Sequence, residues 1–193
     1  QNYSISYQTG TLTVTQAELA ITVKADDASK TYDGSALTKD SATLTEGTLA
    51  TGDYLVNTVT GTIMNAGTET NTLSDVKVMH PAETEGGEPT DVTANYSITK
   101  QNGTLTIDPV TIVLTADSAS KTYDGSALTK DSYKITTGAF VGEEGLASVT
   151  VEGSQTLVGS SANTITAHTL KDGTLAQNYS ISYQTGTLTV TQA

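Results

Sequence analysis

Residues 29–41 read SKTYDGSALTKDS, and the same thirteen residues return without a change at 120–132. A second identity sets the period: QNYSISYQTGTLTVTQA occupies residues 1–17 and again 177–193, which are 176 positions apart. A diverged copy of this stretch starts at Asn95, 93 residues after Asn2 and 83 before Asn178. The chain is therefore predicted to be a slice of a tandem array in which two unequal units make one larger repeat.

The composition favours strands. Only 36% of the 193 residues are hydrophobic, with nine Tyr, one Phe and no Trp, and the net charge is −12. Low hydrophobicity and high charge lean towards disorder, but many short runs alternate strictly between apolar and polar residues. These runs are rich in Thr, Val, Ile and Tyr, which suit half-buried strands.

The composition also excludes several classes of function. The absence of cysteine excludes disulfides and cysteine-based metal sites. Nine basic against 21 acidic residues make nucleic acid and anionic membranes poor partners. No stretch approaches the roughly 20 apolar residues of a membrane helix, and no signal peptide is recognised at the start, so we expect no membrane insertion in this segment.

Residues 1–17 are predicted to form a β-hairpin, the closing hairpin of a preceding repeat. YSISY and TLTVT alternate on either side of a turn at Gln8-Thr9-Gly10. In the diverged copy the turn becomes Asn102-Gly103, and Asn-Gly favours hairpins because both residues tolerate positive φ. The same hairpin is therefore expected three times.

The remaining periodic runs predict about seven short strands per unit, a number typical of a β-sandwich. The expected strands are 21–24, 42–44, 54–59, 61–64 and 72–79 in the first unit, and 111–115, 133–136, 147–152, 156–158 and 163–167 in the second. We predict an all-β chain of two tandem Ig-like β-sandwich domains, 18–109 and 110–193, in an elongated array. The alternative is a β-grasp-like repeat, which needs a helix that the sequence does not suggest.

The stretch repeated at 29–41 is predicted to be structural. We call residues 30–35 and 121–126 the first and second tyrosine turns. In each, Asp-Gly favours a turn directly after a tyrosine. We expect the tyrosine to fill the open end of a thin core and the lysine to be a solvated edge charge. The motif residues are Lys30, Tyr32, Asp33, Gly34, Lys121, Tyr123, Asp124 and Gly125.

Two groups of acidic residues suggest a metal, and both are weighed against simple solvation. The first unit is longer by a loop at 80–91 that holds His80, Glu83, Glu85, Glu88 and Asp91, without the ordered spacing of a calcium loop. At the domain junctions, calcium is a weaker hypothesis that uses Asp26, Asp27, Asp33, Asp108, Asp117 and Asp124. We favour solvated surface carboxylates in both places and predict no metal and no cofactor.

The sequence supports neither an internal crosslink nor a catalytic site. Lys30 or Lys121 with a strand Asn and a carboxylate could form an isopeptide bond, but no diagnostic spacing supports this. His80 and His168 occupy non-corresponding positions, and the adjacent carboxylates are Asp26-Asp27 and Glu143-Glu144. No serine lies in a nucleophile elbow. We therefore predict no catalytic residue and no enzyme.

The order Lys-Thr-Tyr-Asp-Gly, then Asn-Tyr-Ser-Ile and Gly-Thr-Leu-Thr, resembles the YDG/MBG-type repeats of bacterial surface proteins. The resemblance rests on 30–34 with 95–107 and on 121–125 with 178–190, and it covers both units almost end to end. It implies an extracellular stalk of an adhesin that lifts a binding head from the bacterial surface or cell wall. The family assigns no catalytic residues.

We predict a structural stalk or spacer whose partners are neighbouring repeats, with host glycan or protein bound through other domains. A repeat array suits a spacer because its length scales with copy number. One alternative is glycan or mucin binding through aromatic faces, for which Tyr7, Tyr133 and Tyr183 are the candidates. A second is self-association into a filament through the edges of the 1–17 hairpin.

Overall fold

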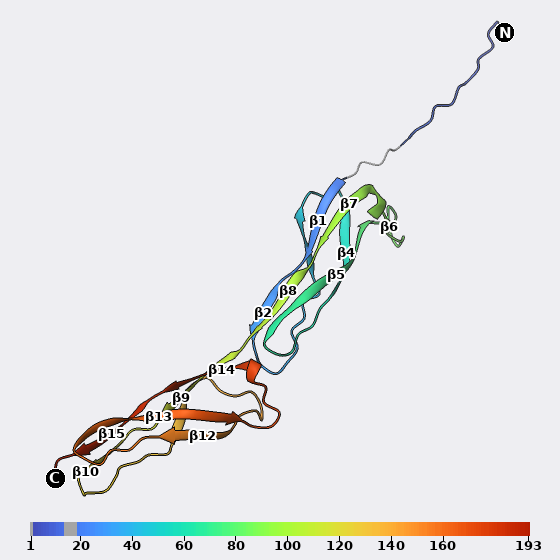
Figure 1. Cartoon of the computed structure of the whole chain (residues 1–193). Coiled ribbons are helices and arrows are strands. Elements are labelled where there is room, and N and C mark those ends of the chain that lie inside the picture. The colour runs from blue at the N-terminus through green and yellow to red at the C-terminus, as the bar shows by residue number, and fades with distance from the viewer. Residues whose placement is uncertain (1, 14–18) are drawn as a thin grey trace. The chain divides into compact units, whose positions relative to one another are not determined.

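The computed structural model describes residues 2–13 and 19–193 and is almost entirely β-structure (Figure 1). This confirms the predicted all-β class. The first eight strands are β1 (Leu19–Ala25), β2 (Ala28–Thr31), β3 (Ala42–Glu46), β4 (Tyr54–Thr60), β5 (Gly67–His80), β6 (Thr90–Asp91), β7 (Tyr96–Gln101) and β8 (Gly103–Asp108). The next seven are β9 (Val110–Ala116), β10 (Ala119–Thr122), β11 (Tyr133–Thr137), β12 (Leu146–Glu152), β13 (Gly159–Leu170), β14 (Tyr179–Gln184) and β15 (Gly186–Thr191).

The helix that a β-grasp repeat requires has no counterpart among these residues. In the described part of the chain the helical segments are two single turns of 3₁₀-helix, η1 (Thr93–Asn95) and η2 (Ala176–Asn178). Neither has the length or the apolar character needed to span a bilayer.

The chain forms two compact units, and their borders differ from those of the sequence repeats. The first comprises Asp40–Val59 and Thr72–Asn102 with the described residues up to Asp26. The second comprises Asp27–Lys39, Thr60–Asn71 and Gly103–Ala193. The first tyrosine turn therefore belongs to the second compact unit, although its sequence lies in the first repeat.

In the first unit, β1 is the centre of a three-stranded sheet with the order β3-β1-β7. It pairs antiparallel with β3 and parallel with β7. Strand β5 ends beside the short β6, where Met79 faces Asp91. The core contains side chains from β1, β4, β5 and β7, so that the three-stranded sheet packs against the β4 and β5 strands; its buried members are Ile21, Val23, Ala25, Val59, Leu73, Val76, Val78 and Tyr96.

The second unit repeats this arrangement with β9 at the centre of the sheet β11-β9-β14 and a four-stranded sheet β10-β15-β13-β12. Strand β9 pairs antiparallel with β11 and parallel with β14. The unit also holds β2 and the first residues of β5, which both pair with β8. Its buried core members are Tyr32, Ile107, Ile112, Leu114, Ala116, Ile165 and Tyr179.

The predicted hairpins at 95–107 and 178–190 are wrong, because the two strands of each pair with different neighbours. Strand β14 pairs with β9, whereas β15 pairs with β10 and β13. The glycine between them is not a turn residue, since Gly186 has no positive φ. Gly186 is needed because the backbone passes close by: a Cβ there would lie 2.5 Å from the carbonyl oxygens of Ala116 and Asp117.

The hairpin predicted for residues 1–17 is absent from residues 2–13, the part of it that the structure describes. None of residues 2–13 is in a strand, and Tyr3 and Leu12 are 91% and 101% exposed. Residue 1 and residues 14–17 lie outside the described residues. Since 178–189 have the same sequence as 2–13 and are largely strand, partner strands rather than local propensity decide the conformation.

Most of the other predicted strands are confirmed, with two exceptions and three omissions, namely β2, β10 and the two-residue β6 within the predicted 80–91 loop. Residues 61–64 and 156–158 contribute no strand; the bridges there are Leu37 with Ile63 and Leu128 with Gln155. Strands β2 and β10, which carry the lysines of the tyrosine turns, were not predicted, because ASKT has no apolar alternation.

Candidate functional site

The two tyrosine turns have the same closed geometry. Gly34 and Gly125 have φ values of +80° and +81°, a conformation that glycine adopts without strain. The Lys30 Nζ donates to Asp33 Oδ1 at 2.6 Å and to the backbone oxygen of Ser35 at 2.7 Å. The lysine is thus not the solvated edge charge that we expected, since it closes the turn on itself.

The second tyrosine turn repeats these contacts. Lys121 Nζ donates to Asp124 Oδ1 and to the Ser126 backbone oxygen, both at 2.7 Å. The lysine hydrogen bond, followed by those from the serine, holds the pKa of Asp33 and of Asp124 well below the usual range of an aspartate. The contacts within each turn therefore favour the ionised form of its aspartate.

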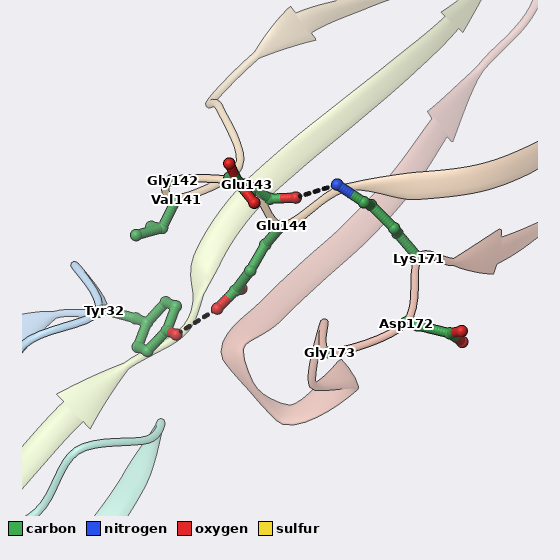
Figure 2. Close-up of a pocket in the computed structure, with 9 residues that line it drawn as sticks. Tyr32, Val141, Gly142, Glu143, Glu144, Lys171, Asp172 and Gly173 are labelled. Atoms are coloured by element: carbon green, nitrogen blue, oxygen red, sulfur yellow. Dashed lines mark hydrogen bonds between the residues drawn. The ribbon is translucent and has the colours of Figure 1, made fainter.

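The Tyr32 side chain points out of the first tyrosine turn and packs in the core of the second compact unit. It is only 7% exposed, and its hydroxyl donates to Glu144 Oε1 at 2.6 Å (Figure 2). Tyr179 donates to the other oxygen, Oε2, at 2.5 Å and accepts from the Val141 backbone N–H at 3.0 Å. The two tyrosine rings meet edge to face with centroids 5.9 Å apart. One carboxylate thus holds two phenols.

This shared carboxylate changes the acidity of both phenols. The hydrogen bond to Glu144 and then burial raise the pKa of Tyr32. Burial and then the hydrogen bond to Glu144 raise the pKa of Tyr179 to about 12. Both effects act against a phenolate, which would lose its hydrogen bond and lie beside a negative charge.

A second contact lies beside the first. The Asn178 side chain is fully buried; its Oδ1 accepts from the Ala66 N–H at 2.8 Å and its Nδ2 donates to Asn65 Oδ1 at 3.1 Å. We call Tyr32, Gly34, Asn65 and Ala66 the tyrosine end, and Val141, Glu144, Asn178 and Tyr179 the carboxylate face. The hydrogen bonds between the tyrosine end and the carboxylate face connect segments that are more than 100 residues apart in the sequence.

The carboxylate face borders an open hollow of about 410 Å³. Its wall runs from Tyr32 past the 141–144 loop to Lys171, Asp172 and Gly173 (Figure 2). The Lys171 ammonium is turned to the Glu143 backbone oxygen at 2.9 Å. Both Glu144 oxygens accept from tyrosines, so this carboxylate is held by Tyr32 and Tyr179 at the wall of the hollow.

Comparisons with models of protein families, with curated proteins and with solved structures found no match.

The first compact unit contains its own version of the carboxylate face. Tyr96 donates to Asp53 Oδ2 at 2.5 Å and accepts from the Ala50 N–H at 2.9 Å, as Tyr179 does with Glu144 and Val141. The other oxygen of Asp53 contacts His80 Nδ1 at 2.5 Å. The hydrogen bonds from Tyr96 and then from His80 lower the pKa of Asp53. Here a histidine takes the oxygen that Tyr32 takes on Glu144.

The junction aspartates weighed as calcium ligands each have their own protein partners. Asp26 accepts from the hydroxyls of Ser41 and Thr43, and Asp27 from the Thr104 N–H. Asp117 accepts from the Ser132 hydroxyl at 2.6 Å and lies 3.4 Å from the Lys134 ammonium. Across residues 2–13 and 19–193, no group of three or more His, Asp or Glu is placed to hold a metal ion.

The 80–91 loop is likewise divided among different contacts. His80 contacts Asp53, and Asp91 accepts from the Thr93 N–H at 3.0 Å. The three glutamates between them are exposed: Glu83, Glu85 and Glu88. The loop's titratable groups therefore do not converge on one point.

The aromatic residues proposed for glycans have different environments. Tyr7 is 91% exposed, whereas Tyr133 is half-buried against the core of the second unit. Tyr183 lies edge to face with His168, and its hydroxyl contacts the His168 Nδ1. His168 and His80 thus serve separate local contacts, one with a tyrosine and one with an aspartate.

Sequence reasoning missed the carboxylate face. Asn95-Tyr96 and Asn178-Tyr179 form a repeated motif in the sequence, where alternation predicts the start of a hairpin. The signal that identifies them is the pairing of a repeated Asn-Tyr with an acidic residue in both units, Asp53 and Glu144. Because one unit uses Asp and the other Glu, the repeat alone did not reveal it.

Proposed function

We propose that this chain is a structural stalk or spacer of a bacterial cell-surface adhesin or surface fibre. In this proposal the repeats stand outside the cell, at the surface or in the cell wall, and carry a binding head that other domains provide. The chain itself catalyses no reaction, and its partners are neighbouring repeats. A stalk must resist tension along its length, so the proposal depends on how each unit would carry a load.

The observation that supports this proposal is that the central strand of the three-stranded sheet in each unit, β1 or β9, pairs in parallel with a strand that lies much later in the sequence. Strand β1 pairs with β7 from Leu19 opposite Tyr96 to Lys24 opposite Gln101. Strand β9 pairs with β14 over six residues in the same way. When the start of one parallel strand and the end of its partner are pulled apart, all the hydrogen bonds between them are sheared together. Such a seam resists tension better than one opened a bond at a time.

Single-molecule pulling tests this function. The chain has no cysteine, so introduced pairs define where force is applied. One variant carries cysteines at the two chain ends. The other carries Lys134→Cys and Gln184→Cys, two exposed positions on the outer strands β11 and β14, which direct the force across the sheet.

We expect the second unit to unfold at a several-fold higher force when it is pulled from the ends than when it is pulled across the sheet. Forced unfolding reports the unfolding rate under load, which is the property that a stalk needs. Equal forces in the two directions would remove the mechanical argument. Binding of the isolated chain to a glycan array would instead favour the adhesion-module alternative.

A further inference from the structure

Both halves of the contact around Tyr32 occur a second time in this chain, and the second copies are more exposed at Tyr123 and at Asn95. Tyr32 is 7% exposed, but Tyr123, in an identical sequence context, is 43% exposed. A Cβ on Gly34 would lie 3.1 Å from Val141, whereas one on Gly125 would meet no atom within 4 Å. The second tyrosine turn thus has the shape of the first without the surface that covers it.

The rest of the second tyrosine end is apolar and exposed. Asn65 and Ala66 correspond to Leu157 and Val158, since each pair directly precedes a glycine of positive φ at the start of a long strand. Leu157 and Val158 are 68% and 56% exposed. The second tyrosine end is therefore more apolar than the first, and it comprises Tyr123, Gly125, Leu157 and Val158.

The second carboxylate face lies in the first compact unit, and its asparagine shows the same contrast, although Tyr96 is as buried as Tyr179. It comprises Ala50, Asp53 and Tyr96, which correspond to Val141, Glu144 and Tyr179 by their hydrogen bonds, and Asn95, which corresponds to Asn178 in the repeated sequence. Asn178 is fully buried beneath Asn65 and Ala66, whereas Asn95 is exposed. Among the described residues no tyrosine end lies on this face, and His80 contacts the Asp53 oxygen that corresponds to the one bound by Tyr32.

We propose that the second tyrosine end docks on the carboxylate face of the first unit in a second copy of this repeat. Tyr123 of one copy then donates to Asp53 of the next, and Leu157 and Val158 cover Asn95. The contact is heterologous, so it adds further copies head to tail rather than closing a dimer. A second copy is the partner that this chain supports, because the first tyrosine end already packs on a carboxylate face within the chain, around Tyr32 and Glu144.

The charges at the docking site allow this contact. The Asp53 side chain is 8% exposed, accepts from Tyr96 and contacts His80, so Tyr123 binds it by displacing His80, whose side chain is 41% exposed. With a net charge of −12, two copies repel each other at low salt. Screening at physiological ionic strength reduces this repulsion, so docking should strengthen as salt is added.

Photocrosslinking of the full chain tests the docking. A benzoylphenylalanine replaces Tyr123, and the protein is irradiated at high concentration in physiological salt. We expect a covalent dimer whose crosslinked peptides come from the neighbourhood of Ala50, Asp53 and Asn95 of the other copy. The same photoreactive residue in place of Tyr183, which is 40% exposed, is the matched control and should not crosslink to these peptides.

Two surface variants complete the test. Asn95→Arg places a bulky positive charge on the second carboxylate face, and Val158→Asp places a negative charge on the second tyrosine end. Both positions are exposed, so neither variant should change the melting temperature. Each should reduce the crosslinked dimer by at least tenfold. No dimer, crosslinks to unrelated peptides, or full yield in both variants would overturn the proposal. These outcomes are independent of the pulling experiment, because docking does not require that the chain bear load.

Discussion

At the scale of single residues, identical sequences in this chain meet different surroundings. Tyr32 and Tyr123 belong to the same thirteen-residue stretch, yet one is a core residue and the other is partly exposed. What differs is the carboxylate face, which covers the first tyrosine. The two positions therefore offer matched substitutions in which the sequence context is constant and only the burial changes.

Tyr32→Ala should destabilise the second compact unit by about 3 kcal/mol, the range for removing a buried aromatic ring. Tyr123→Ala should cost less than about 1 kcal/mol, because much of its ring is already in water. Urea unfolding followed by circular dichroism measures both. Equal losses in the two variants would show that the tyrosine stabilises its own turn rather than the contact with Glu144.

The shared carboxylate predicts a loss of stability at high pH. The pKa values of Tyr32 and Tyr179 are raised in the folded state, that of Tyr179 to about 12. Their contribution to stability is complete below the ordinary tyrosine pKa near 10 and disappears as the pH rises towards 12. Absorbance at 295 nm should show phenols that ionise only as the second unit unfolds. In Tyr179→Phe the last ionising phenol should be missing.

Asn163 is predicted to be a stabilising buried residue. Its side chain is fully buried, and its Nδ2 donates to the backbone oxygens of Asp117 and Lys130, both at 2.8 Å. Asn163→Ala leaves both carbonyls without this donor and should cost about 2–3 kcal/mol. The control is Asn95→Ala, an exposed asparagine whose loss should change the melting temperature little. Similar melting temperatures for the two variants would contradict this role.

At the scale of elements, the notable feature is that consecutive strands leave one sheet and join another without a turn. Strand β14 pairs with β9 and β15 pairs with β10 and β13; a single residue, Thr185, separates the two strands, and β15 begins at Gly186. A glycine is required there because the chain crosses closely over the end of β9. The period-2 pattern of each strand is correct in both interpretations, which is why alternation alone suggested a hairpin.

Gly186→Ala should destabilise the second unit by more than about 1 kcal/mol, because a methyl group would lie 2.5 Å from two backbone oxygens. Gly10 has the same sequence neighbours, but no atom lies within 4 Å of its Cβ position. Gly10→Ala should therefore leave the melting temperature unchanged. Calorimetry measures the melting temperatures of both variants. An unchanged melting temperature in Gly186→Ala would contradict the close backbone contact and favour an ordinary turn at Gly186.

At the scale of the whole molecule, the all-β class and most strands could be predicted from the sequence, because alternation and turn residues are local signals. The pairing of strands could not, since it depends on contacts such as Tyr32 with Glu144 that are 112 residues apart. Strands β2 and β10 could not be predicted either, because their residues show no apolar alternation. They form strands by pairing with β8 and β15. The carboxylate face became visible only when these distant segments were placed together.

The exposed residues 2–13 give the molecule an internal standard for proteolysis. Chymotrypsin recognises tyrosine and leucine, and Tyr3, Tyr7 and Leu12 stand in the same sequence as Tyr179, Tyr183 and Leu188. The first three are at least 91% exposed outside any strand, whereas the second three lie in β14 and β15. Cleavage should remove the first copy within minutes and spare the second until the unit opens. The ratio of the two rates, measured on one sequence in one tube, then gives the free energy of opening directly.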